Sequence, residues 1–246
     1  APENELYGLN LFDEVRRYGF QARIIAREEE HDVIHAHDWL SFRAGIEAKR
    51  VSVKPLIVHV HATEFDRTGG HPNQYIFDEE RHGLHAADCI IAVSQHTKNV
   101  IVEHYGIPHE KVVVVHNGID AGEHYRPLPP ALASIRATGK KIVLFVGRIT
   151  IQKGPDYFIK VAKRVLEFDP NVLFIISGSG DMERQIIRLA ADLGLGDKII
   201  FAGFVRGEEL MKLYRAADLY VMPSVSEPFG LTALEALANG TPILVS

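Results

Sequence analysis

The sequence has a single cysteine, Cys89, among its 246 residues, so no disulfide can form within the chain. It has no excess of positive charge, since the formal net charge is −5 at pH 7, and this argues against nucleic acid as a main partner. It has no long apolar run either, because a run such as Ile142–Val146 is far too short to span a bilayer. Together these absences predict a cytoplasmic protein without a membrane span.

Familiar phosphate and metal signatures are also missing. The segment that begins with Gly178 and Gly180 lacks the third glycine of the dinucleotide fingerprint, because Glu183 stands there, and no Gly-Lys-Ser/Thr run exists. No two aspartates lie two positions apart, so the Asp-x-Asp arrangement that often holds a metal on a sugar nucleotide is absent. We therefore expect a phosphate site without metal or cofactor, which relies on side chains and a helix dipole.

Both ends of the sequence suggest a longer protein. The first residue is Ala1 rather than Met, and the last residues, Thr241–Ser246, have the composition of a buried strand. We expect a piece that is truncated at both ends, with the full-length protein as the active form.

The remaining pattern is an alternation of two kinds of segment. Short apolar runs, from Val33–Ala36 to Ile243–Val245, alternate with amphipathic stretches such as Pro155–Phe168. Runs that are apolar throughout indicate strands buried on both faces, as in parallel sheets. The alternation predicts an α/β fold of βαβ units, with mostly parallel sheets flanked by helices. Ligands bind such sheets at the carboxyl ends of the strands.

One segment interrupts this alternation. Residues 121–141 contain Pro127, Pro129 and Pro130, and proline clusters are typical of linkers. We predict two Rossmann-like domains with a cleft between them, divided as an N-terminal domain over 1–125, a linker over 126–139 and a C-terminal domain over 140–246.

Two segments, one in each predicted domain, are alike. Ala86–Ser94 reads AADCIIAVS and Ala216–Ser224 reads AADLYVMPS, so each has Ala-Ala-Asp, an apolar strand and a serine. Two domains of similar construction would produce this pattern. A turn from any helix into any strand that uses Ala-Asp is an equally good explanation at this point.

The best candidate for a phosphate site is the start of the helix expected from Leu231. Free N–H groups and the positive end of the helix attract anions there, and Gly230 lets a ligand approach the backbone closely. Glu227 precedes this start and Glu235 follows eight positions later, so the two carboxylates can share one helix face. For Glu235, an ordinary position on the helix surface is the alternative.

Two cations follow a predicted strand in the same domain. Arg148 and Lys153 lie in Gly147–Ile159, between a buried strand and a helix. Arginine can bind phosphate through two hydrogen bonds, and lysine acts as a point charge. A solvated loop with two ordinary cations is the alternative, but the helix start in the same domain favours a phosphate site.

Two His-x-His pairs end predicted strands. His35 and His37 share one strand face, and so do His59 and His61. Zinc is one interpretation, but zinc needs a third or fourth ligand, and no third cluster has clear spacing. We therefore predict no metal site and expect histidines that are buried or face a substrate. His61 is the best candidate, since it ends its strand and enters the loop Ala62–Gly70.

Seven segments occur in an order that resembles the GT-B glycosyltransferases of the glycogen-synthase-like retaining family, family 4. In chain order they are HAHDW, VHATEFDRTGG, VSQHTK, HNGID, VGRITIQKG, SGSGD and SEPFGLTALEALANGTP. The pair of glutamates eight positions apart, together with Arg148 and Lys153, is the most specific part of this resemblance.

The resemblance implies that the C-terminal domain binds a nucleotide sugar and that the N-terminal domain supplies much of the acceptor side. Arg148 and Lys153 would contact the diphosphate and stabilise the leaving group. Glu227 would bind hydroxyls of the donor sugar, and Glu235 would bind the ribose. His61 would face the donor sugar near its anomeric centre. Other positions would line the same site: Asp38, Asn117, Phe229, Gly230, Leu231 and Thr232.

The activity that the resemblance implies is transfer of a sugar, with glucose expected, from a UDP or ADP donor to a hydroxyl of a glycan or another acceptor. The anomeric configuration would be retained. The residues leave other activities open: a sugar-nucleotide epimerase of the same fold, a zinc-dependent hydrolase built on the His-x-His pairs, and a non-catalytic nucleotide-sugar-binding module.

Overall fold

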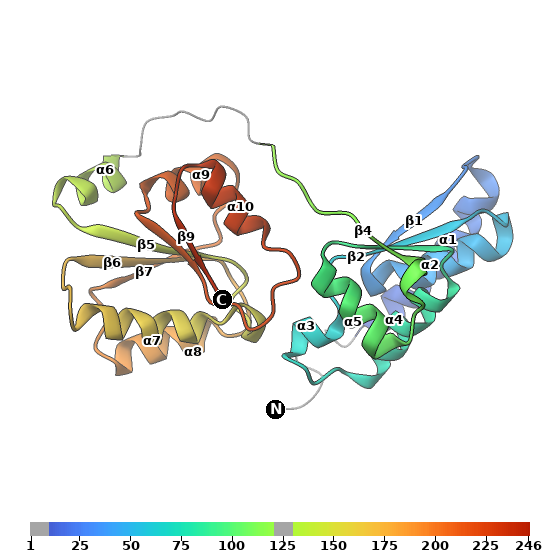
Figure 1. The fold of residues 1–246 in the computed structure, drawn as a ribbon, viewed down its shortest axis with the longest axis horizontal. Coiled ribbons are helices and arrows are strands. Elements are labelled where there is room, and N and C mark those ends of the chain that lie inside the picture. Colours follow the sequence, from blue (N-terminus) through green and yellow to red (C-terminus); the bar gives the residue numbers. More distant parts are fainter. Residues whose placement is uncertain (1–9, 121–129) are drawn as a thin grey trace. The chain divides into compact units, whose positions relative to one another are not determined.

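The computed structural model describes residues 10–120 and 130–246 and contains two α/β units, Ala1–Asn117 and Gly118–Ser246 (Figure 1). The predicted fold class is confirmed, because each unit has a parallel sheet with helices packed on it. None of the helices in the described ranges is both long and apolar enough to cross a bilayer.

In the first unit, four parallel strands lie in chain order. They are β1 Ile34–His37, β2 Leu56–Val60, β3 Cys89–Ala92 and β4 Val112–Val114. The described helices are α1 Leu11–Glu28, α2 Asp38–Ser52, α3 Glu64–Thr68, α4 Gln74–Ala86, α5 Gln95–Tyr105 and the short 3-10 helix η1 His109–Lys111.

Strand β2 shows how this unit builds its core. Leu56, Val58 and Val60 are buried, while Ile57 and His59 are only half-buried, since alternate residues of a strand point to opposite faces. The buried residues pack with side chains from the helices in one cluster. The expectation of strands buried on both faces is therefore wrong for β2 within the described residues.

In the second unit, five parallel strands have the order β7-β6-β5-β8-β9. They are β5 Lys141–Val146, β6 Val172–Ser177, β7 Ile199–Gly203, β8 Leu219–Met222 and β9 Ile243–Val245. The described helices are α6 Pro130–Ala137, η2 Ile151–Lys153, α7 Pro155–Leu166, α8 Glu183–Asp192, α9 Gly207–Ala216 and α10 Leu231–Ala238.

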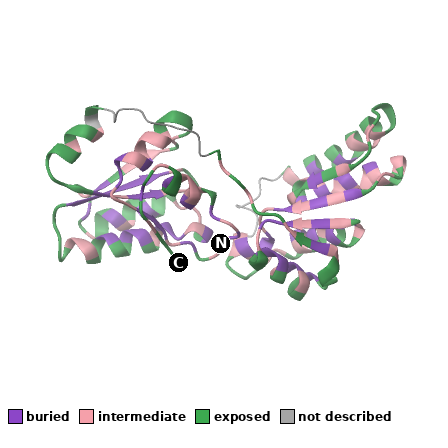
Figure 2. Cartoon of the chain, turned by 45° about the horizontal axis from the view of Figure 1, so that its top comes forward, coloured by how far each residue is buried: buried purple, intermediate pink, exposed green. Residues whose placement is uncertain are grey.

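This second sheet is covered on both faces. Every residue of β6 is buried (Figure 2), and the apolar residues around the sheet form two clusters. One cluster includes Phe158 of α7 and Ile186 of α8, and the other includes Tyr214 of α9 and Ala236 of α10. The sheet is thus doubly wound, as predicted.

Two helices fall where the sequence predicted none. Helix α3 occupies part of the predicted loop Ala62–Gly70, and α6 occupies part of the predicted linker 126–139. The predicted domain limits, 1–125 and 140–246, stay a prediction, because residues 121–129 and the first nine residues lie outside the described ones.

The two similar segments make the same contacts in their own units. Asp88 donates its backbone N–H to Leu56 O at 2.8 Å, and its carboxylate accepts the Leu56 N–H at 2.7 Å. Asp218 makes the same two bonds with Ile142, both at 2.8 Å. In each unit the aspartate therefore fixes one strand against its parallel neighbour, which supports two units of similar construction.

Candidate functional site

The carboxyl ends of β5 and β8 adjoin where the strand order of the second sheet reverses, the usual place for ligands in such sheets. The loops that follow these strands are held together. Val225 N–H donates to Gln152 O at 2.8 Å. Gly154 has φ 62°, and a Cβ there would lie 2.1 Å from Pro223 O. A glycine is therefore required for this close approach of the two loops.

Lys153 and Glu227 meet across these loops. Lys153 Nζ donates to Glu227 Oε2 at 2.6 Å, and Ser224 Oγ donates to the same oxygen at 2.9 Å. Only 20% of the Lys153 side chain and 15% of the Glu227 side chain are exposed. Partial burial strengthens the attraction between the charges, because the effective dielectric is lower than in water. The structure thus brings together two residues that lie 74 positions apart.

Helix α10 begins beside this pair. Gly230 is its N-cap residue, with φ 89°, and no side chain caps the helix start. The first backbone N–H groups therefore have no capping side chain and can bind an anion. Because the helix begins at Leu231, Glu227 lies in the preceding loop. The expectation that Glu227 and Glu235 share a helix face is therefore wrong.

Two buried tyrosines fix side chains on α10. Tyr220 Oη donates to Thr232 Oγ1 at 2.7 Å, and Tyr214 Oη donates to Glu235 Oε2 at 2.8 Å. Burial raises the pKa of both tyrosines, and the nearby Glu235 raises that of Tyr214 further. Both hydroxyls therefore stay protonated donors. Glu235 is half-buried and held in place, so it is not an ordinary surface residue.

The other predicted residues of this unit are more peripheral. Arg148 is exposed and donates to Gln152 Oε1 at 3.1 Å, so it is not part of the Lys153–Glu227 pair. Phe229 is half-buried and Leu231 is 41% exposed. The loop of Gly178 packs directly on the Arg148 loop, since a Cβ on Gly178 would lie 1.8 Å from Gly147 O.

In the first unit, Asp38 and His61 lie together at the ends of β1 and β2. Asp38 Oδ1 accepts the His61 N–H at 2.8 Å. Asp38 has φ 54°, a left-handed conformation that aspartate adopts more readily than most residues. The His61 ring lies 3.0 Å from His37, measured from Nε2 to Nδ1. Asn117 ends this unit and is half-buried.

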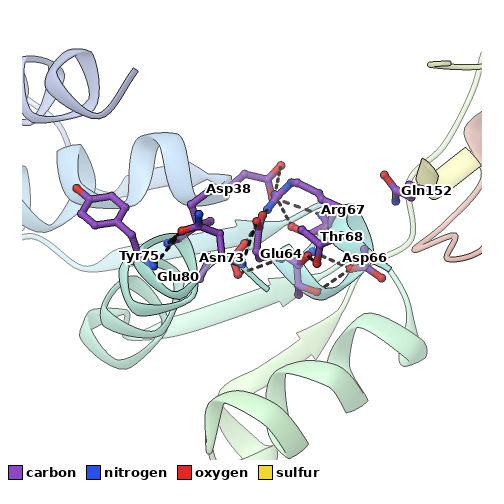
Figure 3. Close-up of polar contacts among 12 residues, drawn as sticks. Asp38, Glu64, Asp66, Arg67, Thr68, Asn73, Tyr75, Glu80 and Gln152 are labelled. Carbon is purple, nitrogen blue, oxygen red and sulfur yellow. Dashed lines mark hydrogen bonds and ion pairs between the residues drawn. The ribbon is translucent and has the colours of Figure 1, made fainter. Parts of the chain in front are cut away.

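The loop after His61 is held by a network that the sequence analysis missed (Figure 3). Arg67 donates to Ala62 O at 2.6 Å and to Glu80 Oε1 at 2.8 Å. Tyr105 Oη donates to the other Glu80 oxygen. Burial raises the pKa of Glu80, although Arg67 opposes this rise. The network thus ties the end of β2 to α4 and α5.

A signal for part of this network was present in the sequence. Thr63 and Asp66 have the spacing of a capping box, and in the structure the Thr63 N–H donates to Asp66 Oδ2 at 2.7 Å. The long-range partners Glu80 and Tyr105 had no such local signal.

The sequence matches two glycosyltransferase family models. The Glycosyltransferase Family 4 model matches residues 6–123, and the model for glycosyl transferases group 1 matches residues 133–246. The first match covers most of the unit Ala1–Asn117, and the second lies within the unit Gly118–Ser246. The comparisons favour neither an epimerase nor a hydrolase.

Curated relatives agree with these matches. An uncharacterized glycosyltransferase of Methanocaldococcus jannaschii is 38% identical and aligns with 89% of this chain and 58% of its own length. A D-inositol 3-phosphate glycosyltransferase of Geodermatophilus obscurus is 34% identical, over 92% of this chain and 55% of the relative. The chain therefore spans little more than half the length of these relatives.

Solved structures have the same fold. Sucrose-phosphate synthase from Thermosynechococcus elongatus superposes with a TM-score of 0.82 at 23% identity, covering 100% of this chain and 63% of that one. Anabaena HepE in complex with UDP and glucose gives a TM-score of 0.76 at 23% identity, covering 98% and 65%. With a family 4 domain followed by a group 1 domain, both in this architecture, the chain belongs to the GT-B glycosyltransferases.

Proposed function

We propose that the protein transfers a sugar from a nucleoside diphosphate sugar to an acceptor hydroxyl with retention of the anomeric configuration. The observation that carries the proposal is the Lys153–Glu227 pair beside the uncapped start of α10. It places a cation, a carboxylate and uncapped backbone N–H groups at the point where the strand order of the second sheet reverses. The donor is UDP-glucose or ADP-glucose in this proposal, and the HepE structure with UDP and glucose supports the first.

The diphosphate binds at Lys153 and the first N–H groups of α10, and Arg148 adds a second cation from its exposed loop. Glu227 then accepts hydrogen bonds from the sugar hydroxyls, and Glu235, held by Tyr214, accepts them from the ribose. Phe229, Gly230, Leu231 and Thr232 surround the ligand at the helix start. The donor thus replaces part of the pairing between Lys153 and Glu227.

In the reaction, the bond between the anomeric carbon and the diphosphate oxygen breaks, and the acceptor oxygen bonds to that carbon on the same face. The departing phosphate takes the proton of the acceptor hydroxyl. Negative charge grows on the diphosphate as the bond breaks, and Lys153, Arg148 and the helix dipole stabilise it. This route needs no metal ion and no covalent intermediate.

The first unit supplies the acceptor side. His61 faces the donor sugar near its anomeric centre, and Asp38 holds the backbone of His61 through its 2.8 Å hydrogen bond. Asn117 lines the same region at the end of this unit.

Product analysis tests the proposal. The purified protein is incubated with the glucose esters of UDP, ADP and GDP, with and without D-inositol 3-phosphate or an oligoglucan, and the products are analysed by NMR. We expect an α-linked product from an α-linked donor, formed only when acceptor is present. A β-linked product would overturn retention, a changed sugar without acceptor would indicate an epimerase, and zinc-dependent release of free sugar would indicate a hydrolase.

A further inference from the structure

The pairing of β1 with β2 brings the two His-x-His pairs together. The strands are parallel with His37 opposite His59, and residues two apart share a face. The His35 and His59 ring centroids lie 5.5 Å apart with planes inclined by 1°, and those of His37 and His61 lie 5.3 Å apart. Each pair by itself lacks a third metal ligand, but the neighbouring strand supplies one.

Three of these rings have donor atoms at metal-binding spacing. One ring nitrogen from each of His35, His37 and His59 lies within 4.8 Å of the other two. Nitrogens around a tetrahedral zinc ion lie about 3.4 Å apart, given bonds of about 2.0–2.1 Å. An ion would therefore need the rings to rotate toward one another. Three histidines with one open position are typical of zinc sites that keep a water ligand.

His59 provides an independent observation. Both of its ring nitrogens are buried and have no hydrogen-bond partner among the described residues. A neutral imidazole has one N–H donor and one lone pair, and each unsatisfied buried polar atom costs about 1–3 kcal/mol. An ion bound to the lone pair removes this cost for one of the two nitrogens.

The contacts of the neighbouring rings also suit a metal ion. His37 Nδ1 already contacts His61, which leaves His37 Nε2 for an ion and fixes the ring, as second partners of metal ligands do. His35 and His37 are exposed, so an ion can reach the cluster.

We propose that His35, His37 and His59 bind one divalent transition-metal ion of the zinc class, with water in the remaining position and His61 orienting His37. The proposal concerns metal binding alone. It assigns no hydrolysis to the ion and does not depend on the proposed sugar transfer.

Titration of the purified, chelator-treated protein with Co²⁺ and Zn²⁺ tests the site. Cobalt absorbance and calorimetry should both give one ion per chain. His59→Ala and His35→Ala should each weaken binding at least tenfold. His82→Ala is the matched control, because His82 is an exposed histidine on α4, and this variant should bind as the parent does. Absence of binding, or equal binding by the His59 and His82 variants, would overturn the proposal.

Thermal unfolding distinguishes loss of the metal site from poor folding of a variant. Zn²⁺ should raise the melting temperature of the parent by mass action and should leave the melting temperature of His59→Phe unchanged. Without metal, His59→Phe should melt no lower than the parent, since it removes two unpaired buried nitrogens. An equal zinc-induced rise in both proteins would also contradict the site.

Discussion

The two units share one construction but differ in the chemistry at their strand ends. In both, an aspartate makes a pair of hydrogen bonds to the neighbouring strand, Asp88 to Leu56 and Asp218 to Ile142. At the ends of the strands, the first unit presents a cluster of imidazole side chains, whereas the second presents the ion pair of Lys153 and Glu227. The two units therefore have the same construction, but the side chains at the carboxyl ends of their strands differ in chemistry.

The cations near the carboxyl ends of the strands in the two units, Arg67 and Lys153, also differ in their partners. Arg67 in the first unit joins buried carboxylates and a backbone carbonyl, and its side chain is 14% exposed. Lys153 in the second unit joins one partly buried carboxylate in a loop. Removal of Arg67 should thus affect folding, while removal of Lys153 should affect catalysis.

Lys153→Ala should have the largest effect on turnover. Loss of one preorganised group that stabilises developing charge costs about 10²–10³-fold in kcat, and the remaining Arg148 should not compensate because it is exposed. Steady-state kinetics with the best donor measures the change. Lys160→Ala is the control, since Lys160 is a surface lysine of α7 that pairs with Asp156. Parent-like turnover by Lys153→Ala would show that Lys153 has no catalytic part.

Arg67→Met should be the most destabilising change in the first unit. It leaves Glu64 and Glu80 without their shared cation, although they are only 0% and 3% exposed, and breaking a buried pair costs about 3–5 kcal/mol. Urea unfolding at pH 7 measures the loss. Lys153→Met, in the second unit, should reduce stability clearly less. Equal losses would show that the two cations do not differ in their structural role.

Asp88→Asn and Asp218→Asn should each destabilise their own unit by about 1 kcal/mol, since each replaces a charged acceptor of a strand N–H by a neutral amide oxygen. Similar losses in urea unfolding would sharpen the case for one repeated construction. A loss in only one unit would count against it.

The pH dependence of Asp88 adds a second readout. Hydrogen bonds from Lys49 and the Leu56 N–H lower the pKa of Asp88 in the folded state. Its contribution is therefore present above the pKa of the unfolded carboxyl, about 3.9, and is lost as the pH falls through the lower folded value. Asp88→Asn should thus flatten the fall in stability below about pH 4, which unfolding at pH 7 and at pH 3 can detect.

The sequence predicted the strands and the doubly wound second unit well, because apolar runs and helical periodicity are local signals. It also placed Lys153 at a strand end, where the structure has it in η2. It failed where the outcome depends on tertiary contacts. Glu227 was expected to share a helix face with Glu235, but it lies in the loop before the helix, which begins at Leu231 as predicted. The Arg67 network and the histidine cluster depend on the packing of α4 and on strand register, which spacing alone does not give.

The serines of the two similar segments should give the smallest and most selective effects. Ser94 Oγ accepts the Thr97 N–H at 3.1 Å and caps α5, so Ser94→Ala should cost about 1 kcal/mol of stability and leave kinetics unchanged. Ser224 Oγ donates to Glu227 at 2.9 Å. Loss of such a bond is worth about 0.5–1.5 kcal/mol, so Ser224→Ala should raise the KM for the donor by up to about tenfold. Melting temperatures and KM values for both variants test this division. If Ser94→Ala raised KM as much as Ser224→Ala did, the inferred division between a structural serine and a donor-site serine would be wrong.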